Sequence, residues 1–322
     1  MQDSKKRILF VVNPISGTRS KEGFRQQVDE TLDARKYEWR VVETAYAGHA
    51  SVIASQAVSE GIDICVAVGG DGTVNEVARS LIQSPTTLGI VPCGSGNGLA
   101  RHLCLPMNTK GALEIINQGH VEPFDYGIIN GQPFFCTCGV GFDAFVSLKF
   151  AESGKRGLVT YVENVLREGL KYKPETYTVE DETGVHRYKA FLITCANAAQ
   201  YGNNAYIAPG ASMQDGLMDV IVMEPFGVLE APKLALDLFA KTISSNSCIK
   251  TFQARRVHIR RENPGAIHYD GDPIQMGTEI DVEMRHHNLR AVVNPEVIED
   301  KAHPNKMANA LSSIVNALLS VR

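Results

Sequence analysis

Two acidic turns are the parts of this chain best suited to chemistry. The first is Asp71, inside Gly69-Gly70-Asp71-Gly72 and directly after the apolar run 64–68. Three glycines in four residues allow positive φ angles and let backbone N–H groups point at an anion, most often a phosphate. A carboxylate beside phosphates repels them unless a cation intervenes, so Asp71 indicates Mg²⁺ or a proton-accepting role. The alternative is a residue that only holds the turn.

The second acidic turn is Asp270-Gly271-Asp272. Interpreted as an extended segment, it predicts that both carboxylates project to one side, separated by a glycine. Two close carboxylates suit a general base with a neighbouring charge that raises its proton affinity. An ordinary Asp-Gly hairpin turn explains the same residues equally well.

A third acidic loop covers residues 211–219. Its Asp215, with nearby backbone carbonyls, could hold a cation that prefers oxygen ligands. Taken alone, Asp215-Gly216 is more typical of a simple turn.

The elements that must position these turns alternate between strand-like and helix-like segments over the first 125 residues, which predicts a parallel α/β sheet. Strands are expected at 8–12, 39–44, 64–68 and 88–91, each followed by a helix. Thr73 is predicted to cap the helix after the third strand, because Glu76 follows it at the capping-box spacing.

Three of these strands end in small polar residues, at 13–17, 69–73 and 94–98. Ligands of open parallel sheets bind at the carboxyl ends of the strands, so the three turns are predicted to share one edge and face one ligand. A Walker A motif is absent, and 94–99 has Leu99 at the sixth position, where a Rossmann fingerprint requires glycine. Dinucleotide oxidoreductase chemistry is therefore disfavoured.

From about Asp125 the chain changes to short β-rich segments separated by turns, which predicts an antiparallel sandwich or barrel with a helical insert. Helices are expected at 161–170 and 227–243. We predict an α/β domain at 1–125, a β-rich domain at 126–293, and a return of 294–322 to the first domain. Within that return, apolar residues at helical spacing in 304–322 favour a closing helix over a membrane-surface helix.

Composition narrows the function classes. The 322 residues carry a net charge of −4, which gives no reason to expect a nucleic-acid partner. Seven cysteines, an odd number mostly within apolar runs, indicate reduced thiols in a cytosolic protein. With no signal peptide and no apolar run near 20 residues, any membrane role is expected at the surface. The basic stretch 255–261 is expected to be a solvated strand face, with attraction to an anionic membrane as the minor alternative.

With these motifs in order, the chain resembles the diacylglycerol kinase-like lipid kinases, a superfamily that includes sphingosine and ceramide kinases. Gly-Gly-Asp-Gly alone is shared with NAD kinases and phosphofructokinases, but the joint occurrence of the motifs is specific. They are Asn13-Pro14-x-Ser16-Gly17, Thr44 with Gly48-His49-Ala50, Gly69 to Glu76, Pro92-x-Gly94-Ser95-Gly96-Asn97, Asp215-Gly-x-x-Asp219 and Asp270-Gly271-Asp272.

The resemblance implies ATP-dependent phosphorylation of a lipid hydroxyl, in a cleft between an α/β domain and a β-sandwich. It assigns the general base to Asp270 or Asp272, or to Asp71 as in sphingosine kinases. Asp272 stands where the family usually has a longer Glu. The positions implied for ATP are Asn13, Pro14, Ser16, Gly17, Thr44, Gly69, Gly70, Asp71, Gly72, Thr73, Asn75, Glu76, Gly94, Ser95, Gly96 and Asn97.

The resemblance also implies a Mg²⁺ site at Asp215 with the carbonyls of Ser212 and Leu217, although Gln214 replaces an acidic residue that many relatives carry. We therefore expect a cytosolic, ATP- and Mg²⁺-dependent kinase that visits the inner face of the membrane to phosphorylate a diacylglycerol or related lipid alcohol. Relatives of this type often pair, so a homodimer is among the assemblies expected. The alternatives are a kinase for a soluble substrate, of the NAD kinase type, and a non-catalytic lipid- or nucleotide-binding protein.

Overall fold

The N-terminal half is built on a parallel sheet of buried apolar strands. The computed structural model describes residues 5–15, 23–153, 172–227 and 229–295, without the side chains of 150–153. The strands lie in the order β2-β1-β3-β4, all parallel, as the alternating pattern predicts. Their bounds are β1 (Lys6–Val12), β2 (Tyr37–Glu43), β3 (Ile64–Gly69) and β4 (Thr87–Pro92).

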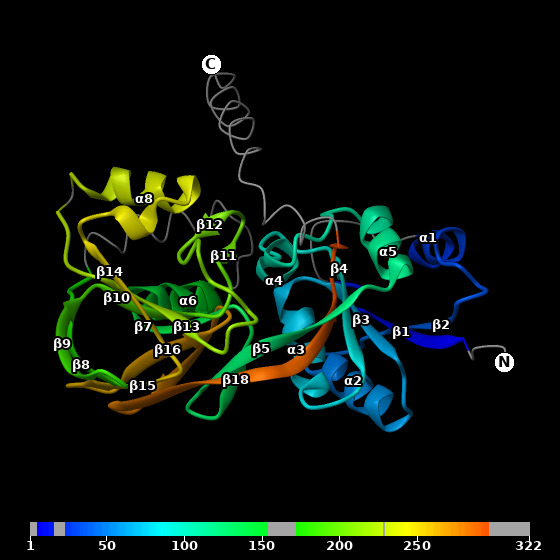
Figure 1. Ribbon diagram of the computed structural model, residues 1–322, viewed down its shortest axis with the longest axis horizontal. Helices are drawn as coiled ribbons and strands as arrows, with labels where there is room; N and C mark the ends of the chain where they lie inside the picture. Colours follow the sequence, from blue (N-terminus) through cyan, green and yellow to red (C-terminus); the bar gives the residue numbers. More distant parts are fainter. Residues whose placement is uncertain (1–4, 16–22, 154–171, 228, 296–322) are drawn as a thin grey trace, which may run out of the picture.

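Helices flank this sheet (Figure 1). They are α1 (Phe24–Thr31), α2 (His49–Ser59), α3 (Asp71–Leu81), α4 (Gly98–His102) and α5 (Thr109–Gln118). The predicted capping box is wrong, because α3 already begins at Asp71, with the extended Gly70 before it. Thr73 therefore lies inside the helix, and Glu76 instead accepts hydrogen bonds from the N–H groups of Gly48 and Ala50, at 3.0 and 3.1 Å.

The C-terminal half is a β-sandwich. One sheet has the order β14-β13-β10-β7-β16-β17. The other side is formed by the run β18-β15-β8-β9 of the larger sheet, and the apolar core lies between them. The bounds are β7 (Thr137–Gly141), β8 (Glu175–Asp181), β9 (Gly184–Ala190), β10 (Leu192–Ala196), β13 (Met218–Met223), β14 (Ile249–Ala254), β15 (Arg256–Arg261), β16 (Gly265–Tyr269) and β17 (Asp272–Met276).

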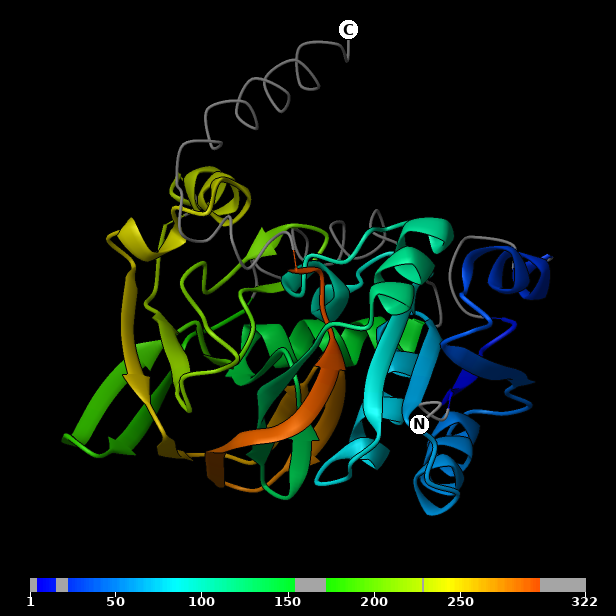
Figure 2. The same cartoon turned by 45° about the vertical axis from the view of Figure 1, so that its right-hand side comes forward.

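The two halves are joined by an antiparallel ribbon of β5 (Val121–Ile129) and β18 (Glu279–Val292), which crosses the molecule from one half to the other (Figures 1 and 2). β18 begins beside β15 and ends beside β4, where Ala291 pairs with Leu88. Its register against β5 shifts between Arg285 and Leu289, and His287 there has a φ of 52°. A single ten-stranded sheet therefore runs through both halves.

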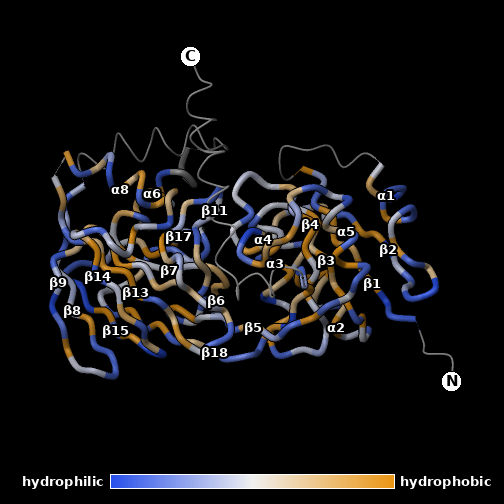
Figure 3. The backbone as a smooth tube through the Cα atoms, turned by 45° about the horizontal axis from the view of Figure 1, so that its top comes forward, coloured by the Kyte–Doolittle hydropathy of each residue, from blue (hydrophilic) through white to orange (hydrophobic). Residues whose placement is uncertain are grey.

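Hydrophobic segments are concentrated inside each half (Figure 3). A further apolar cluster lies under α6 (Phe142–Ser153) and α8 (Ala231–Ala240). The remaining elements are β6 (Gln132–Phe134), β11 (Gln200–Gly202), β12 (Ala205–Tyr206) and the 3-10 turn Ile243–Ser245. The helix expected at 161–170 and the closing helix at 304–322 lie outside the described residues, and the domain boundaries stay a prediction.

The positive charges of the basic stretch 255–261 are partly neutralised by acidic residues of the neighbouring strand β18. On β15, Arg256 pairs with Glu283 of β18 at 2.6 Å, and His258 pairs with Glu279 and Asp281 at 2.6 and 2.8 Å. This arrangement favours a solvated strand face over an anion-seeking patch. All seven cysteines are free thiols. Among the described residues, no helix is long and apolar enough to cross a membrane.

We predict that Gly127→Ala destabilises the fold. Gly127 of β5 lies opposite Phe134, and a Cβ at this glycine would come within 2.0 Å of the Phe134 ring. Because the two residues are paired between β5 and β6, neither backbone can move freely, and overpacking of this kind typically costs about 1–3 kcal/mol. Urea unfolding followed by circular dichroism measures the change. Gly277→Ala is the control, since it points into open space; equal stability of the two variants would contradict the prediction.

Candidate active site

The three polar turns meet at the carboxyl ends of the parallel strands, as the sequence predicts. Asn13, after β1, donates from Nδ2 to Thr73 Oγ1 at 3.2 Å. A Cβ on Gly94, after β4, would lie 2.7 Å from the Cα of Gly70, so the second and third turns touch through their backbones. Thr44 follows β2, and its backbone N–H donates a hydrogen bond to the carbonyl of Val12 at 2.8 Å. Of the expected ATP positions, Ser16 and Gly17 lie outside the described residues.

Asp71 ties two of these turns together. Its Oδ1 accepts a hydrogen bond from the N–H of Gly98 at 2.7 Å, and its Oδ2 accepts one from Asn97 at 2.9 Å. A side chain at Gly96 would collide with the carboxylate, at 2.7 Å. The side-chain amide of Asn97 in turn holds Gly94: its Oδ1 accepts from Gly94 N at 3.0 Å, and its Nδ2 donates to Gly94 O at 2.7 Å. Both oxygens of Asp71 are engaged, which favours a residue that holds the turn over a proton acceptor.

The acidic hairpin places its two carboxylates differently from the expectation. Asp270 and Gly271 have φ angles of 51° and 88°, and they form the two-residue connection between β16 and β17, where Tyr269 pairs with Asp272. Two successive positive φ angles are the signature of a type I′ turn, which Asp-Gly adopts readily. The prediction of an extended segment with both side chains on one side is therefore wrong.

Asp270 is held by backbone amides. Its Oδ1 accepts from Cys136 and Thr137 at 2.7 and 3.0 Å, and its Oδ2 accepts from Phe135 at 2.8 Å. Burial raises the pKa of Asp270 from 3.8 to about 6, against the lowering effect of these three N–H groups. The carboxylate thus fastens the hairpin tip to the segment before β7.

Asp272 is the open member of the pair. Its side chain is 56% exposed, and its nearest cation is Arg79 of α3, whose Nη2 lies 3.6 Å from Oδ2. Desolvation raises the pKa of Asp272, and Arg79 opposes this effect. Within the described residues, the carboxylate accepts no close hydrogen bond, so it is available to a ligand.

Cys136 shows that the acidic hairpin and the glycine turns lie near each other. Its Sγ lies 3.5 Å from the position of a Cβ on Gly98, at the start of α4. Burial is the main cause that raises the pKa of its thiol, and the charges of Asp270 and Asp71 add to it. Both carboxylates therefore lie in the surroundings of one thiol.

Sequence reasoning missed a buried network beneath the hairpin. His268, 2% exposed, contacts Asp143 Oδ2 through Nε2 at 3.0 Å, and Thr194 donates to the same oxygen at 2.7 Å. The Tyr201 hydroxyl lies 2.8 Å from that of Thr194. Sequence reasoning missed Arg79 as well. No spacing signal links these residues, because their contacts join segments far apart in the chain.

The loop 211–219 fits the chemistry of a Mg²⁺ site. Asp215 Oδ1 accepts from Leu217 N at 3.0 Å, which leaves Oδ2 without a partner among the described residues. Among the described residues, the carbonyls of Ser212 and Leu217 likewise accept none of the loop or side-chain hydrogen bonds. All these donors are oxygens, as Mg²⁺ requires. The buried Asp125 fixes the loop, because its Oδ2 accepts a hydrogen bond from Gly216 N at 2.7 Å.

We predict a pH-dependent stability difference between the protein and Asp270→Asn. With a folded-state pKa of about 6 and an ordinary value of 3.8, Asp270 keeps its proton in the folded state at pH values where the unfolded chain releases it. This contribution to stability is complete below pH 4 and is lost as the pH rises to about 6, by up to about 3 kcal/mol. Urea unfolding between pH 4 and 7 measures it.

The variant lacks this titration, so the advantage of the unsubstituted protein over Asp270→Asn is expected to shrink across that range. A growing advantage would instead show that the three amide bonds outweigh burial and hold the pKa of Asp270 below 3.8.

Comparisons with known proteins agree with this geometry. The model of the diacylglycerol kinase catalytic domain matches residues 7–129, and that of the YegS C-terminal NAD kinase beta sandwich-like domain matches residues 136–292. A diacylglycerol kinase of Bacillus subtilis (strain 168) is 28% identical over 276 residues, covering 83% of this chain and 90% of that protein. One of Staphylococcus aureus (strain MRSA252) is 28% identical over 235 residues, covering 70% and 73%.

Solved structures share the fold. A diacylglycerol kinase from Bacillus anthracis str. Sterne superimposes with a TM-score of 0.72 at 22% identity, over 91% of this chain and 98% of that one. An NAD kinase from Archaeoglobus fulgidus in complex with ATP gives 0.50 at 15% identity, over 90% and 94%. The chain thus combines a diacylglycerol kinase catalytic domain with a YegS-type, NAD kinase-like β-sandwich, which is the domain composition of an ATP-dependent kinase.

Proposed function

We propose that this protein is an ATP- and Mg²⁺-dependent lipid kinase that phosphorylates the hydroxyl of a diacylglycerol or a related lipid alcohol. The observation that carries the proposal is the open carboxylate of Asp272, on a hairpin whose tip and the glycine turns meet around Cys136. A lipid substrate also calls for peripheral association with a membrane surface. That association and the homodimer remain predictions.

In this proposal the triphosphate lies against the glycine turns and the first turn of α3. Helix N-termini favour anions because their N–H groups are unpaired and the helix dipole is positive there. Gly72, in that first turn, has open space where a Cβ would lie, so a phosphate can approach the backbone closely. Bound Mg²⁺ would supply further neutralisation of the phosphate charge. Asp71 and Glu76 would support ATP indirectly, by holding the turns.

Asp272 would accept the proton of the attacking hydroxyl. Phosphoryl transfer asks a protein mainly for positioning and charge neutralisation, and a general base adds about 10²–10⁴-fold. Asp270, saturated by three N–H groups, would hold the hairpin in place for this step. This division of roles favours Asp272 over Asp270 as the proton acceptor.

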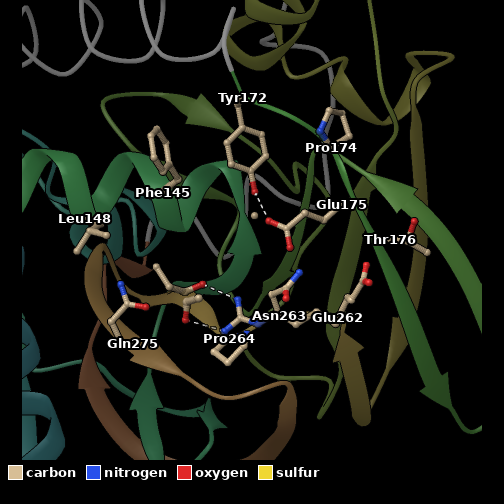
Figure 4. A pocket seen from close by; sticks show the side chains of 14 residues that line it. Phe145, Leu148, Tyr172, Pro174, Glu175, Thr176, Glu262, Asn263, Pro264 and Gln275 are labelled. Carbon is tan, nitrogen blue, oxygen red and sulfur yellow. Dashed lines mark hydrogen bonds between the residues drawn. The ribbon is translucent and has the colours of Figure 1, made fainter.

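A cavity of about 550 Å³, lined by both apolar and charged side chains, offers space for part of a substrate. It lies along the far end of the β16–β17 hairpin, at Gly265, Ala266 and Gln275. Figure 4 shows Phe145 and Leu148 projecting from α6 beside Tyr172 at one side of the cavity, with Glu175 and Glu262 at another. Gln275 follows Asp272 by three positions along the extended strand, a distance of about 10 Å. An acyl chain could therefore extend from the acidic turn into the cavity.

We predict that Asp272→Asn lowers lipid-dependent ATP turnover by about 10²–10⁴-fold, the contribution of a general base. The melting temperature should stay close to that of the unsubstituted protein, because the side chain is 56% exposed. A coupled ATPase assay with dioctanoylglycerol in mixed micelles, in Mg²⁺ buffer, measures the rate. Asp270→Asn is the comparison, since it should lose stability as well as activity.

Turnover of Asp272→Asn near the original rate would refute the role of Asp272 as the proton acceptor. Phosphorylation of NAD in lipid-free buffer, without turnover of any lipid alcohol, would identify a kinase for a soluble substrate instead.

We also predict that Leu148→Gln raises the KM for a long-chain diacylglycerol several-fold. The change puts an amide into the apolar side of the cavity, and it should leave the KM for ATP unchanged. Val185→Gln is the matched control, because Val185 is 64% exposed on β9 and does not line the cavity. Equal KM values for the two variants would exclude the cavity as the acyl site.

A further inference from the structure

One cation connects the nucleotide-binding helix with the acidic hairpin. Arg79 lies in the last turn of α3, eight residues after Asp71, which is about 12 Å along the helix axis. Its Cζ lies 4.8 Å from the ring centroid of Tyr269, and its Nη2 lies 3.6 Å from Asp272 Oδ2. Tyr269 and Asp272 are the paired residues that flank the hairpin turn. The guanidinium therefore contacts both sides of the hairpin at its tip.

This guanidinium is not satisfied by hydrogen bonds. Its Nε and Nη2 are buried and have no hydrogen-bond partner among the described residues. Leaving buried donors unpaired typically costs about 1–3 kcal/mol, and more for charged groups, so such an arrangement points to a role outside simple packing. The planar fork of an arginine matches a carboxylate, and a shift of less than about 1 Å would bring Asp272 into hydrogen-bond range.

We propose that Arg79 is a positioning residue, which keeps Asp272 ionised and in place at the hairpin and thereby couples the nucleotide-binding helix to the proton acceptor. The proposal rests on the proposed function of Asp272. The Tyr269 ring supports the guanidinium face, as in other cation–π contacts. Because Asp272 has a short side chain, a fixed partner on α3 limits the positions that its carboxylate can adopt.

The charges around Asp272 define what Arg79 contributes. From α3 it is faced by Arg79 and Glu76, from β16 by His268 and Tyr269, and from the turn by Asp270. α6, which packs on β17, carries Asp143 and Lys149, and Asp143 is bound to His268. Arg79 and His268 favour the ionised carboxylate, whereas Glu76 disfavours it. Without Arg79, the main fixed charges left nearby are acidic.

The test compares Arg79→Ala, Arg79→Lys and the control Arg290→Ala, at an exposed position of β18. The first readout is the carboxyl titration of Asp272 by NMR in ¹³C-aspartate-labelled protein without substrate, assigned by its absence in Asp272→Asn. We expect Arg79→Ala to move the midpoint upward by about one pH unit, the low end for loss of a close opposite charge at a half-exposed group. Arg79→Lys keeps the positive charge, so its midpoint should stay close to that of the unsubstituted protein. Arg290→Ala should show no shift.

The second readout is the pH dependence of kcat/KM for the lipid, whose acid limb should move with the NMR midpoint. Tyr269→Leu, which removes the ring but leaves both charges, should give part of the same shift, and Tyr269→Phe should give none. An unmoved midpoint in Arg79→Ala would overturn the proposal. So would a raised KM for ATP with an unchanged acid limb, which would make Arg79 a phosphate ligand.

The two proposals fail in distinguishable ways. If the protein phosphorylates no lipid but the NMR midpoint moves as expected, the lipid kinase function is wrong and the coupling of Arg79 to Asp272 stands. If lipid turnover depends on Asp272 but the midpoint is insensitive to Arg79, the coupling is wrong and the kinase function stands.

Discussion

The buried carboxylate of Asp125 is the interaction on which the geometry of both halves depends. It is 0% exposed, in the middle of β5, at the point where the β5–β18 ribbon passes between the halves. It accepts hydrogen bonds from His286 Nδ1 at 2.8 Å, from His287 N at 2.7 Å and from Gly216 N at 2.7 Å. A buried charge is tolerated only when it is saturated in this way. The irregular part of β18 and the loop 211–219 are therefore fixed to one another by a single group.

The acidic residues of the site differ in role because of what surrounds them. Asp71 and Asp270 have both oxygens occupied by backbone N–H groups, and each joins two segments of chain. Asp272, two residues after Asp270, has a half-exposed carboxylate with a cation at 3.6 Å. All three lie in Gly-Asp-Gly or Asp-Gly-Asp patterns, so residue type and spacing are the same kind of signal in each. Only the three-dimensional hydrogen bonding separates the residues that hold a turn from the one that is open.

Much of the fold was predictable from the sequence, because it depends on patterns that are local. All six residues of β3 are buried, as expected for a strand covered on both faces, and the glycine turns follow the strands where the alternation places them. The start of α3 was not predictable from capping rules, since the extended Gly70 between β3 and α3 provides no side-chain cap. Arg79 and the His268–Asp143 pair were beyond reach for a different reason: their partners are brought close only by the packing of distant strands.

The path of β18 also has a consequence for synthesis of the chain. In the parallel sheet of the N-terminal half, β4 pairs on its outer side with β18, through Ala291 near the end of the described residues. A nascent chain that has emerged only to about residue 125 therefore presents β4 as an open edge, with unpaired N–H and C=O groups that invite pairing with other chains. Completion of this sheet waits until Ala291 has left the ribosome, so a segment that is made early is closed late.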